Sequence, residues 1–421
     1  MKEVRVGIIG GGMISHRHMV IYSNIQRRAA ELGFTAKVVA CCEIDDEKRK
    51  KWAEMYHMDE KDMYKDFREM LKRDDLDTID VCVHNNLHTP IAIAVMKAGF
   101  DCYCEKPEAA SYTDARMMID CAKKLGRKYH VQMSSLMTPQ TRVGRDMIAA
   151  GKLGNPYFVN LHQNTMRRRP GYDAGLRDFT TDFYSKKISG HGPSIDLGVY
   201  VIGQILFMLG CPELESVSGF AKQAMEIDER LLRDPDGFGV EDIFSGLAKF
   251  KNGLGFNLCF TSANNAKEYS MTYILGSKGG LEVLDTDTVG GKYARRPGQG
   301  RPSWMGEPNL KFFGQLDGRD VSIDLRCDEN GMQEEITNPN MMLYNDNQVM
   351  WLAYKLGILN DETRYNTPEI AAQQLLFTDG IFLSEELGRS VTADEIKAMS
   401  PSLCLREQQI GSELVKFDFD F

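Results

Sequence analysis

The chain has 421 residues, of which 43% are hydrophobic and 26% charged, and its formal net charge is −9. This length and composition predict a globular protein of two domains, each able to bury its own core. The acidic balance argues against general nucleic-acid binding, which requires clustered basic charge, and no apolar run is long enough to span a membrane.

A strand-like run and a glycine-rich turn open the chain. Residues 4–9 are mostly apolar and β-prone, and residues 10–15 read Gly-Gly-Gly-Met-Ile-Ser. In a dinucleotide-binding turn, Gly10 allows the tight bend, Gly12 lets the backbone approach a pyrophosphate, and Ser15 is the small third residue before a helix. An ordinary glycine turn can match the same pattern, but the strand–helix units that follow favour the nucleotide interpretation. The predicted cofactor contacts in this turn are Gly10, Gly12, Met13 and Ile14.

A second apolar run, residues 36–42, ends at Glu43. A carboxylate at this place accepts hydrogen bonds from the adenosine ribose and repels a 2′-phosphate, which favours NAD over NADP. An acid here also suits the start of the next helix, and the two roles can coexist.

Three more strand-like runs alternate with helical patterns, at residues 78–83, 101–104 and 129–133. This alternation predicts a doubly wound parallel sheet of the Rossmann type over residues 1–135, with ligands beyond the carboxyl ends of the strands. The loops at those ends carry Asn85, His88, Glu105 and Lys106, which we expect near the cofactor.

Lys106 is the candidate acid/base. Oxidation of a secondary alcohol requires a group that takes the hydroxyl proton, and burial beside an oxidised nicotinamide lowers the pKa of a lysine toward neutrality. A solvated surface lysine is the alternative. Glu105 either orients the nicotinamide or the local backbone, or forms a simple ion pair with Lys106.

The pattern changes in the second half, residues 136–421. The runs 243–250 and 254–260 flank Lys-Asn-Gly at residues 251–253, a strong hairpin signal that indicates a mostly antiparallel sheet. Other strand-like runs are 156–162, 269–275 and 280–284, and helices are predicted over 347–358 and 368–387. Residues 286–345 show no clear pattern.

The chain resembles the glucose-fructose oxidoreductase/inositol dehydrogenase (Gfo/Idh/MocA) family over nearly its whole length. The resemblance implies an NAD-binding Rossmann domain, a C-terminal α/β domain with a large open sheet, and homo-oligomers formed through that sheet. The matching positions are residues 10–15, Glu43, His88, 105–107, 190–200, 276–280 and 384–389. Departures are His191 within a usual triple glycine, Tyr200 where histidine is frequent, and a missing arginine in residues 134–139.

Asp196 and Tyr200 are the family's candidate partners of Lys106. Their spacing of four in a segment with a helical pattern predicts one shared helical face. A carboxylate and a phenol can bind sugar hydroxyls and share a proton with the lysine. The alternatives are a helix N-terminal acid and a core tyrosine.

Other candidate substrate contacts are His191, Arg169 and Tyr172. The last two belong to a basic, aromatic loop at residues 167–172, which either lines a substrate mouth or is a solvated charge run. His191 either contacts substrate or is an exposed loop residue.

The resemblance predicts hydride transfer between NAD and a secondary hydroxyl, at C3, of a sugar or glycoside. The alternatives are an NAD-dependent glycoside hydrolase that oxidises C3 transiently, an inositol- or dihydrodiol-type dehydrogenase, and a non-catalytic nucleotide-binding regulator. We expect no nucleic-acid or membrane partner. Ten scattered cysteines without zinc-like spacing predict free thiols, no metal site and a cytoplasmic location, and the chain enters a strand within a few residues.

Overall fold

The computed structural model describes residues 1–164, 169, 182–227, 239–266, 269–283, 310–325, 347–359 and 366–421. The chain divides into two units, the first comprising Met1–Gln132, Asn338–Glu369 and Ser402–Phe421, and the second Met133–Thr337 and Ile370–Pro401. This differs from the single predicted boundary between residues 135 and 136, because two later segments return to the first unit.

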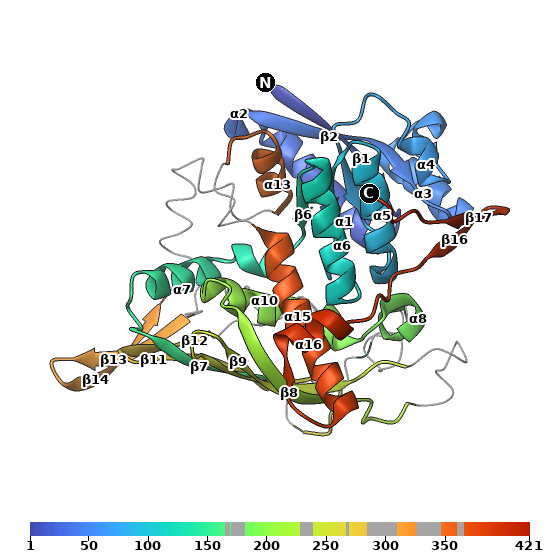
Figure 1. Ribbon diagram of the computed structural model, residues 1–421. Coiled ribbons are helices and arrows are strands. Elements are labelled where there is room, and N and C mark those ends of the chain that lie inside the picture. Colours follow the sequence, from blue (N-terminus) through green and yellow to red (C-terminus); the bar gives the residue numbers. More distant parts are fainter. Residues whose placement is uncertain are drawn as a thin grey trace. The chain divides into compact units, whose positions relative to one another are not determined.

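A six-stranded parallel sheet forms the centre of the first unit (Figure 1). Its strand order, β3-β2-β1-β4-β5-β6, reverses direction between β1 and β4, which is where such sheets bind ligands. The doubly wound prediction is therefore confirmed. The strands are β1 (Lys2–Ile9), β2 (Phe34–Cys42), β3 (Met63–Tyr64), β4 (Thr78–Val81), β5 (Asp101–Cys104) and β6 (Tyr129–Val131).

Local signals at the helix ends explain where the helices of this unit start and stop. The Asp45 and Ser111 side chains accept N–H groups of the first turns of α3 and α6, and Gly33 and Gly126 end α2 and α6 in the left-handed conformation. The helices are α1 (Met13–Arg27), α2 (Ala29–Leu32), α3 (Asp46–Tyr56), α4 (Phe67–Met70), α5 (Asn85–Lys97) and α6 (Tyr112–Leu125), with a 3-10 turn η1 (Glu60–Asp62).

The first returning segment packs an aromatic helix, α13 (Asn347–Lys355), onto the parallel sheet. Trp351 is fully buried, and its ring centroid lies 6.1 Å from that of Tyr103 and 5.9 Å from that of His130. The Thr367 hydroxyl accepts the main-chain N–H of Val131 at 2.9 Å. The segment therefore covers the β5–β6 end of the sheet and supplies part of the core of this unit.

The second returning segment is held by Asp114, a fully buried carboxylate on α6. Asp114 accepts the main-chain N–H groups of Leu403 at 2.8 Å and Cys404 at 3.0 Å, and the Ser402 hydroxyl at 2.6 Å. A two-stranded hairpin, β16 (Glu407–Ile410) and β17 (Glu413–Lys416), follows. The end of the chain thus belongs to the first unit.

The second unit contains a nine-stranded, mostly antiparallel sheet in the order β14-β13-β12-β11-β7-β10-β9-β8-β15. The Asn-Gly hairpin is confirmed between β9 and β10, where Gly253 has a φ of 85°. The strands are β7 (Pro156–Asn164), β8 (Leu214–Lys222), β9 (Ile243–Phe250), β10 (Gly255–Thr261), β11 (Tyr269–Gly276), β12 (Gly279–Val283), β13 (Leu310–Leu316), β14 (Arg319–Leu325) and β15 (Val391–Thr392). The hairpin of β13 and β14 lies where the sequence shows no clear pattern.

Helices of the second unit lie on one face of this sheet (Figure 1). Phe377 packs edge-on against Phe256, and Ile381 fills the space left by Gly246, so the long helix α15 is seated on the sheet. The helices are α7 (Pro139–Ala149), α8 (Lys186–Ser189), α9 (Pro193–Asp196), α10 (Gly198–Met208), α15 (Thr367–Leu387) and α16 (Ala393–Met399), with 3-10 turns η2 (Ser134–Met137) and η3 (Asp182–Tyr184). Among the described helices, none is both long and apolar enough to cross a membrane.

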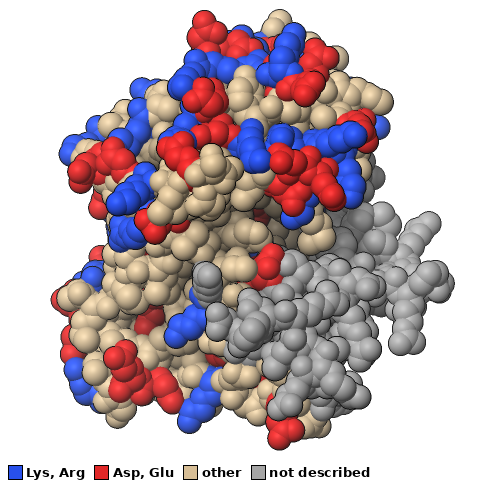
Figure 2. All heavy atoms as spheres, turned by 90° about the vertical axis from the view of Figure 1, so that its right-hand side faces the viewer, with Lys and Arg blue, Asp and Glu red and all other residues tan. Residues whose placement is uncertain are grey.

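Charged side chains of both signs are interspersed on the face of the molecule that Figure 2 shows. Over the described surface as a whole, neighbouring charges also form local ion pairs, such as Lys72 with Glu69 and Arg28 with Glu31. Such exposed pairs contribute little to stability individually. The described part of that face therefore presents no continuous area of one sign to a charged ligand.

Glu108 is a fully buried carboxyl group in the first unit. Neither of its oxygens makes a hydrogen bond of ordinary geometry to the described residues. Burial raises the pKa of Glu108 well above its usual value, although the nearby Tyr129 hydroxyl acts in the opposite direction. The group is therefore protonated in the folded protein at pH values where it is ionised in the unfolded chain.

Glu108→Gln is expected to make the protein more stable than the wild type at neutral and mildly alkaline pH. The folded-state pKa of Glu108 is raised. The contribution of its carboxyl group to the free energy of unfolding is therefore fully present below the unfolded-state pKa and is lost as the pH rises toward the folded-state pKa. The advantage of the variant should grow by up to about 1.4 kcal/mol per pH unit. Urea unfolding at pH 5 and pH 8 measures it, with the exposed Glu54→Gln as control. Parallel loss of stability in wild type and E108Q would contradict the assignment.

Candidate functional site

The glycine turn between β1 and α1 has the geometry that a dinucleotide requires. Gly10 has a φ of 102°, and a Cβ there would lie 2.3 Å from the carbonyl oxygen of Cys82. No atom lies within 4 Å of the place where a Cβ of Gly12 would be, so the backbone is open to a ligand. No side chain caps the first turn of α1, which leaves N–H groups for phosphate oxygens. Met13 is 62% exposed, and Ile14 is half-buried.

Ser15 stabilises this turn through hydrogen bonds. Its side chain is fully buried, its hydroxyl donates to the carbonyl oxygen of Gly12 at 2.7 Å, and it accepts the indole N–H of Trp52 at 3.1 Å. The small residue predicted at the third position of the motif therefore fixes the residue at the second position.

Glu43 lies where the sequence places it, directly after β2, and is 9% exposed. One carboxylate oxygen accepts the main-chain N–H of Gly11 at 2.9 Å, and the other accepts that of Asp45 at 2.9 Å. A carboxylate has about four acceptor positions, so two remain for ribose hydroxyls. The side chain can thus fix the conformation of the turn and bind a ribose at the same time. These residues fit NAD.

His88 and Asn85 lie on α5, directly after β4, and both are buried. The two ring nitrogens of His88 lie 2.7 Å from the carbonyl oxygen of Pro107 and 3.1 Å from that of Val83. Burial lowers the pKa of His88, whereas the hydrogen bonds to these two carbonyl oxygens and the charge of Glu105 act in the opposite direction. The histidine therefore connects the loop after β4 to the loop that carries Lys106.

Lys106 follows β5 and is half-buried, and its peptide bond to Pro107 is cis. Its main-chain N–H donates to one carboxylate oxygen of Glu105 at 3.0 Å. The other oxygen of Glu105 lies 2.8 Å from Nε2 of His18, a buried residue of α1. Both oxygens thus have partners within the protein, which favours the backbone-orienting alternative for Glu105.

His18 continues this network to Asp80 on β4, which lies 2.8 Å from its Nδ1. With Cys82, these residues form the only cluster of three potential metal ligands in the described ranges, all within 4.8 Å of one another. Their polar atoms are hydrogen-bonded directly to one another. The sequence analysis missed this network, because a single histidine on a helix has no distinguishing pattern.

Asp196 and Tyr200 lie in the second unit on two helices rather than one. Asp196 ends α9, Leu197 forms the junction, and Tyr200 lies in the first turn of α10. The segment for which the sequence predicts one shared helical face is therefore interrupted at Leu197, which separates the two helices. Both side chains are half-buried.

Glu241 holds the loop that leads to Asp196. This buried carboxylate accepts the main-chain N–H groups of Gly192 at 3.1 Å and Ser194 at 2.9 Å. A Cβ on Gly192 would lie 2.7 Å from Val240 and 2.8 Å from the carbonyl oxygen of Glu241. The second glycine of the Gly-His-Gly sequence is thus required by close packing.

His191, between these glycines, stacks on Phe382 with 3.9 Å between ring centroids. Burial, with the charge of Lys186, lowers the pKa of His191 to about 4. The ring is therefore neutral at pH 7 and offers a sugar a hydrogen bond rather than a charge.

Arg169 is 2% exposed, and its guanidinium donates to the carbonyl oxygens of Met225 and Glu226 at 3.2 Å. It also lies 3.8 Å from the buried carboxylate of Asp242. These contacts place Arg169 inside the second unit as a support of main chain. Tyr172 lies outside the described residues.

Tyr184 is a buried residue that the sequence analysis did not select. Burial raises the pKa of its phenol, and the nearby carboxylates of Asp196 and Glu241 act in the same direction. Arg169 lies close enough to oppose them. The tyrosine therefore lies beside the predicted catalytic carboxylate, in a stretch that carries no recognisable motif.

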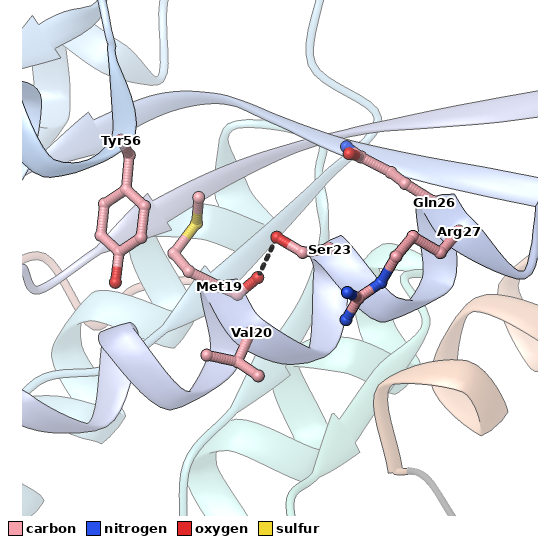
Figure 3. A pocket seen from close by; sticks show the side chains of 6 residues that line it. All are labelled: Met19, Val20, Ser23, Gln26, Arg27 and Tyr56. Atoms are coloured by element: carbon pink, nitrogen blue, oxygen red, sulfur yellow. Dashed lines mark hydrogen bonds between the residues drawn. The ribbon is translucent and has the colours of Figure 1, made fainter.

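A surface hollow lies along α1 (Figure 3), lined by Met19, Val20, Ser23, Gln26, Arg27 and Tyr56. The Ser23 hydroxyl donates to the carbonyl oxygen of Met19 and is thus already engaged. None of these residues belongs to the predicted cofactor or substrate contacts. We therefore assign the candidate site to the glycine turn and strand ends, not to this hollow.

Comparison with known proteins matches the chain to two consecutive domain families. Residues 4–133 match the "Oxidoreductase family, NAD-binding Rossmann fold", and residues 141–282 match the "GFO/IDH/MocA C-terminal domain". D-glucoside 3-dehydrogenase of Escherichia coli K12 is 28% identical over 290 residues, which cover 67% of this chain and 78% of that protein. Levoglucosan dehydrogenase of Pseudarthrobacter phenanthrenivorans is 25% identical over 300 residues, which cover 67% and 73%.

Solved structures share the fold over most of the chain. Levoglucosan dehydrogenase in complex with NADH superposes with a TM-score of 0.70 at 19% identity, covering 93% of this chain and 99% of that chain. An NAD binding oxidoreductase from Klebsiella pneumoniae gives the same TM-score and coverage. With both domains matched in order and the NAD-binding turn intact, the chain belongs to the Gfo/Idh/MocA family of NAD-dependent oxidoreductases.

Proposed function

We propose that this enzyme transfers hydride between NAD and a secondary hydroxyl, at C3, of a sugar or glycoside. The observation that carries the proposal is the placement of Lys106 at the carboxyl end of β5, with its main-chain N–H held by Glu105. The similarity to D-glucoside 3-dehydrogenase and levoglucosan dehydrogenase supports a sugar substrate and, for the former, position 3. The buried free cysteines support a reducing, cytoplasmic location.

In the proposed reaction, Lys106 takes the proton of the substrate hydroxyl through its ε-amino group. Bound NAD would supply the hydride acceptor for the carbon that bears this hydroxyl, so that this carbon would become a ketone and no other bond would change. Asp196 and Tyr200 are the proposed ligands of the sugar hydroxyls and the groups with which Lys106 shares a proton. In the reverse direction Lys106 donates a proton to the developing alkoxide.

The remaining predicted substrate contacts have different roles in this proposal. His191 remains a candidate, because its neutral ring can hydrogen-bond a hydroxyl. Arg169 acts indirectly in this proposal, by supporting the segment around Met225, since its guanidinium is occupied by main-chain carbonyl groups. Tyr172 is retained as a contact for the ring or aglycone.

Inositol is the second candidate substrate, because inositol 2-dehydrogenase of Salmonella is 26% identical over 171 residues, 40% of this chain. The test is a screen of glucose, several glucosides and inositol with NAD, with products identified by NMR. We expect a 3-keto product from a glucoside and stoichiometric NADH. Exclusive turnover of inositol would contradict the substrate, and sugar release without net NADH would indicate the hydrolase alternative.

Lys106→Ala is expected to lower kcat by about 10²- to 10⁴-fold, the usual contribution of general acid–base catalysis. NAD affinity, measured by quenching of protein fluorescence, should stay within about threefold, because the lysine acts on the substrate proton. The exposed Lys72→Ala is the matched control. Near-normal turnover by K106A would overturn the role of Lys106.

Glu43 is proposed to select NAD over NADP. Wild-type protein should bind NAD more tightly than NADP, and Glu43→Gln should narrow the difference, because the carboxylate that repels a 2′-phosphate is removed. Titration of both nucleotides measures the ratio, and the exposed Glu47→Gln is the control. Tighter binding of NADP by wild type would refute this role.

A homo-oligomer through the nine-stranded sheet is also proposed. The face of this sheet away from its helices carries Phe220 and Leu247, which are 38% and 48% exposed. Size-exclusion chromatography with light scattering should give a multiple of 47.5 kDa for wild type. Leu247→Arg should lower that mass, whereas Leu414→Arg in the first unit should not. A monomeric wild type would contradict the proposal.

A further inference from the structure

A buried histidine links the helix after the glycine turn to the strand end that carries Lys106. His18 of α1 is 1% exposed, its Nδ1 lies 2.8 Å from Asp80, and its Nε2 lies 2.8 Å from Glu105. Asp80 belongs to β4 and Glu105 directly follows β5. One imidazole ring therefore bridges three elements of the NAD-binding unit.

The hydrogen bonds determine the charge of this ring. Ionised carboxylates only accept hydrogen bonds, so both ring nitrogens must donate, which only the imidazolium form can do. Each carboxylate also accepts a second hydrogen bond. The Tyr22 hydroxyl donates to Asp80 at 2.9 Å, and the main-chain N–H of Lys106 donates to Glu105 at 3.0 Å. The network thus contains one cation between two anions.

The groups around the ring agree with this charge. Burial works against the charged form, but the carboxylate of Asp80, the neighbouring Cys82 and the hydrogen bonds to both together outweigh it and hold the pKa of His18 well above its usual value. Burial likewise opposes ionisation of Glu105, yet the hydrogen bond and the charge of His18, together with Lys106, keep the pKa of that carboxyl below its usual value. A buried pair of this kind is stable only when each member keeps its partners.

We propose that His18 is a positioning residue of the active site. As a buried imidazolium it holds Glu105 ionised and in one orientation, and Glu105 in turn fixes the main chain of Lys106 and the direction in which its side chain leaves the strand. This inference rests on the proposed function of Lys106, since it assigns to His18 the support of that lysine.

Two substitutions separate the halves of the bridge. The amide nitrogen of asparagine has the same number of bonds to Cα as Nδ1, so His18→Asn can keep the contact with Asp80 and loses that with Glu105. The amide nitrogen of glutamine corresponds in the same way to Nε2, so His18→Gln can keep the contact with Glu105. The pair therefore tests which contact matters, at a similar loss of ring volume.

We expect H18N to lower kcat by roughly 10- to 100-fold, with KM for the sugar and Kd for NAD changed by less than about threefold. H18Q should retain several times more activity than H18N. The control is His16→Asn on the same helix, where the ring contacts the Tyr56 hydroxyl near the surface. Equal activity of H18N and H18Q, or wild-type kcat in H18N, would overturn the proposal.

A measurement on the wild-type protein keeps the inference testable if the variants do not fold. With ¹⁵N-labelled histidine, one of the eight histidines should show two protonated ring nitrogens that persist at pH 9. Burial lowers the pKa of His88, His130, His162 and His191, which disfavours a charged ring at pH 9 in each of them. Absence of a persistent imidazolium at pH 9 would refute the bridge.

The two proposals fail in different ways. If K106A remained active, the acid/base role of Lys106 would be contradicted, whereas the NMR signal of the protonated His18 ring at pH 9 would be unaffected. If K106A were inactive but H18N fully active, only the positioning role of His18 would be contradicted.

Discussion

Buried carboxylates that accept main-chain N–H groups are the interaction on which the loops of this protein depend. Glu43 accepts a main-chain N–H of the glycine turn, and Glu105 accepts that of Lys106. Asp114 binds the returning C-terminal segment in the same way, and Glu241 binds the loop before Asp196. An unpaired buried carboxylate costs several kcal/mol, so each of these groups requires its loop to adopt one conformation. These hydrogen bonds fix the conformation of loop main chain, as strand-to-strand hydrogen bonds do in a sheet. Hydride transfer requires its reacting groups to be held in such fixed positions.

The regular elements could be predicted because each carries its own local signal. Alternating runs indicated the parallel sheet, and Asn-Gly at residues 252–253 indicated the hairpin of the second sheet. The return of residues 347–359 and 402–421 to the first unit could not be predicted, since the packing of Trp351 on Tyr103 joins residues far apart in sequence. Local pattern describes an element but not the core in which it is buried.

The candidate site shows the same limit. The glycine turn, Glu43 and Glu105–Lys106 have a motif, and the structure places each at the end of a parallel strand. His18 has none, and its importance appears only when Asp80 and Glu105 are found on both sides of its ring. Arg169 illustrates the reverse error of inference, because a basic loop resembled a binding surface while its guanidinium is buried against carbonyl groups.

The contacts of Asp114 with Leu403 and Cys404 have a consequence for biosynthesis. Protein chains emerge from the ribosome N-terminus first, and a domain usually folds once its own residues are out. Here residues 1–132 lack Trp351 and residues 402–421, which complete their unit. The NAD-binding unit can therefore complete its core only after the intervening second unit has also been synthesised, although its own first 132 residues come before that unit in the chain.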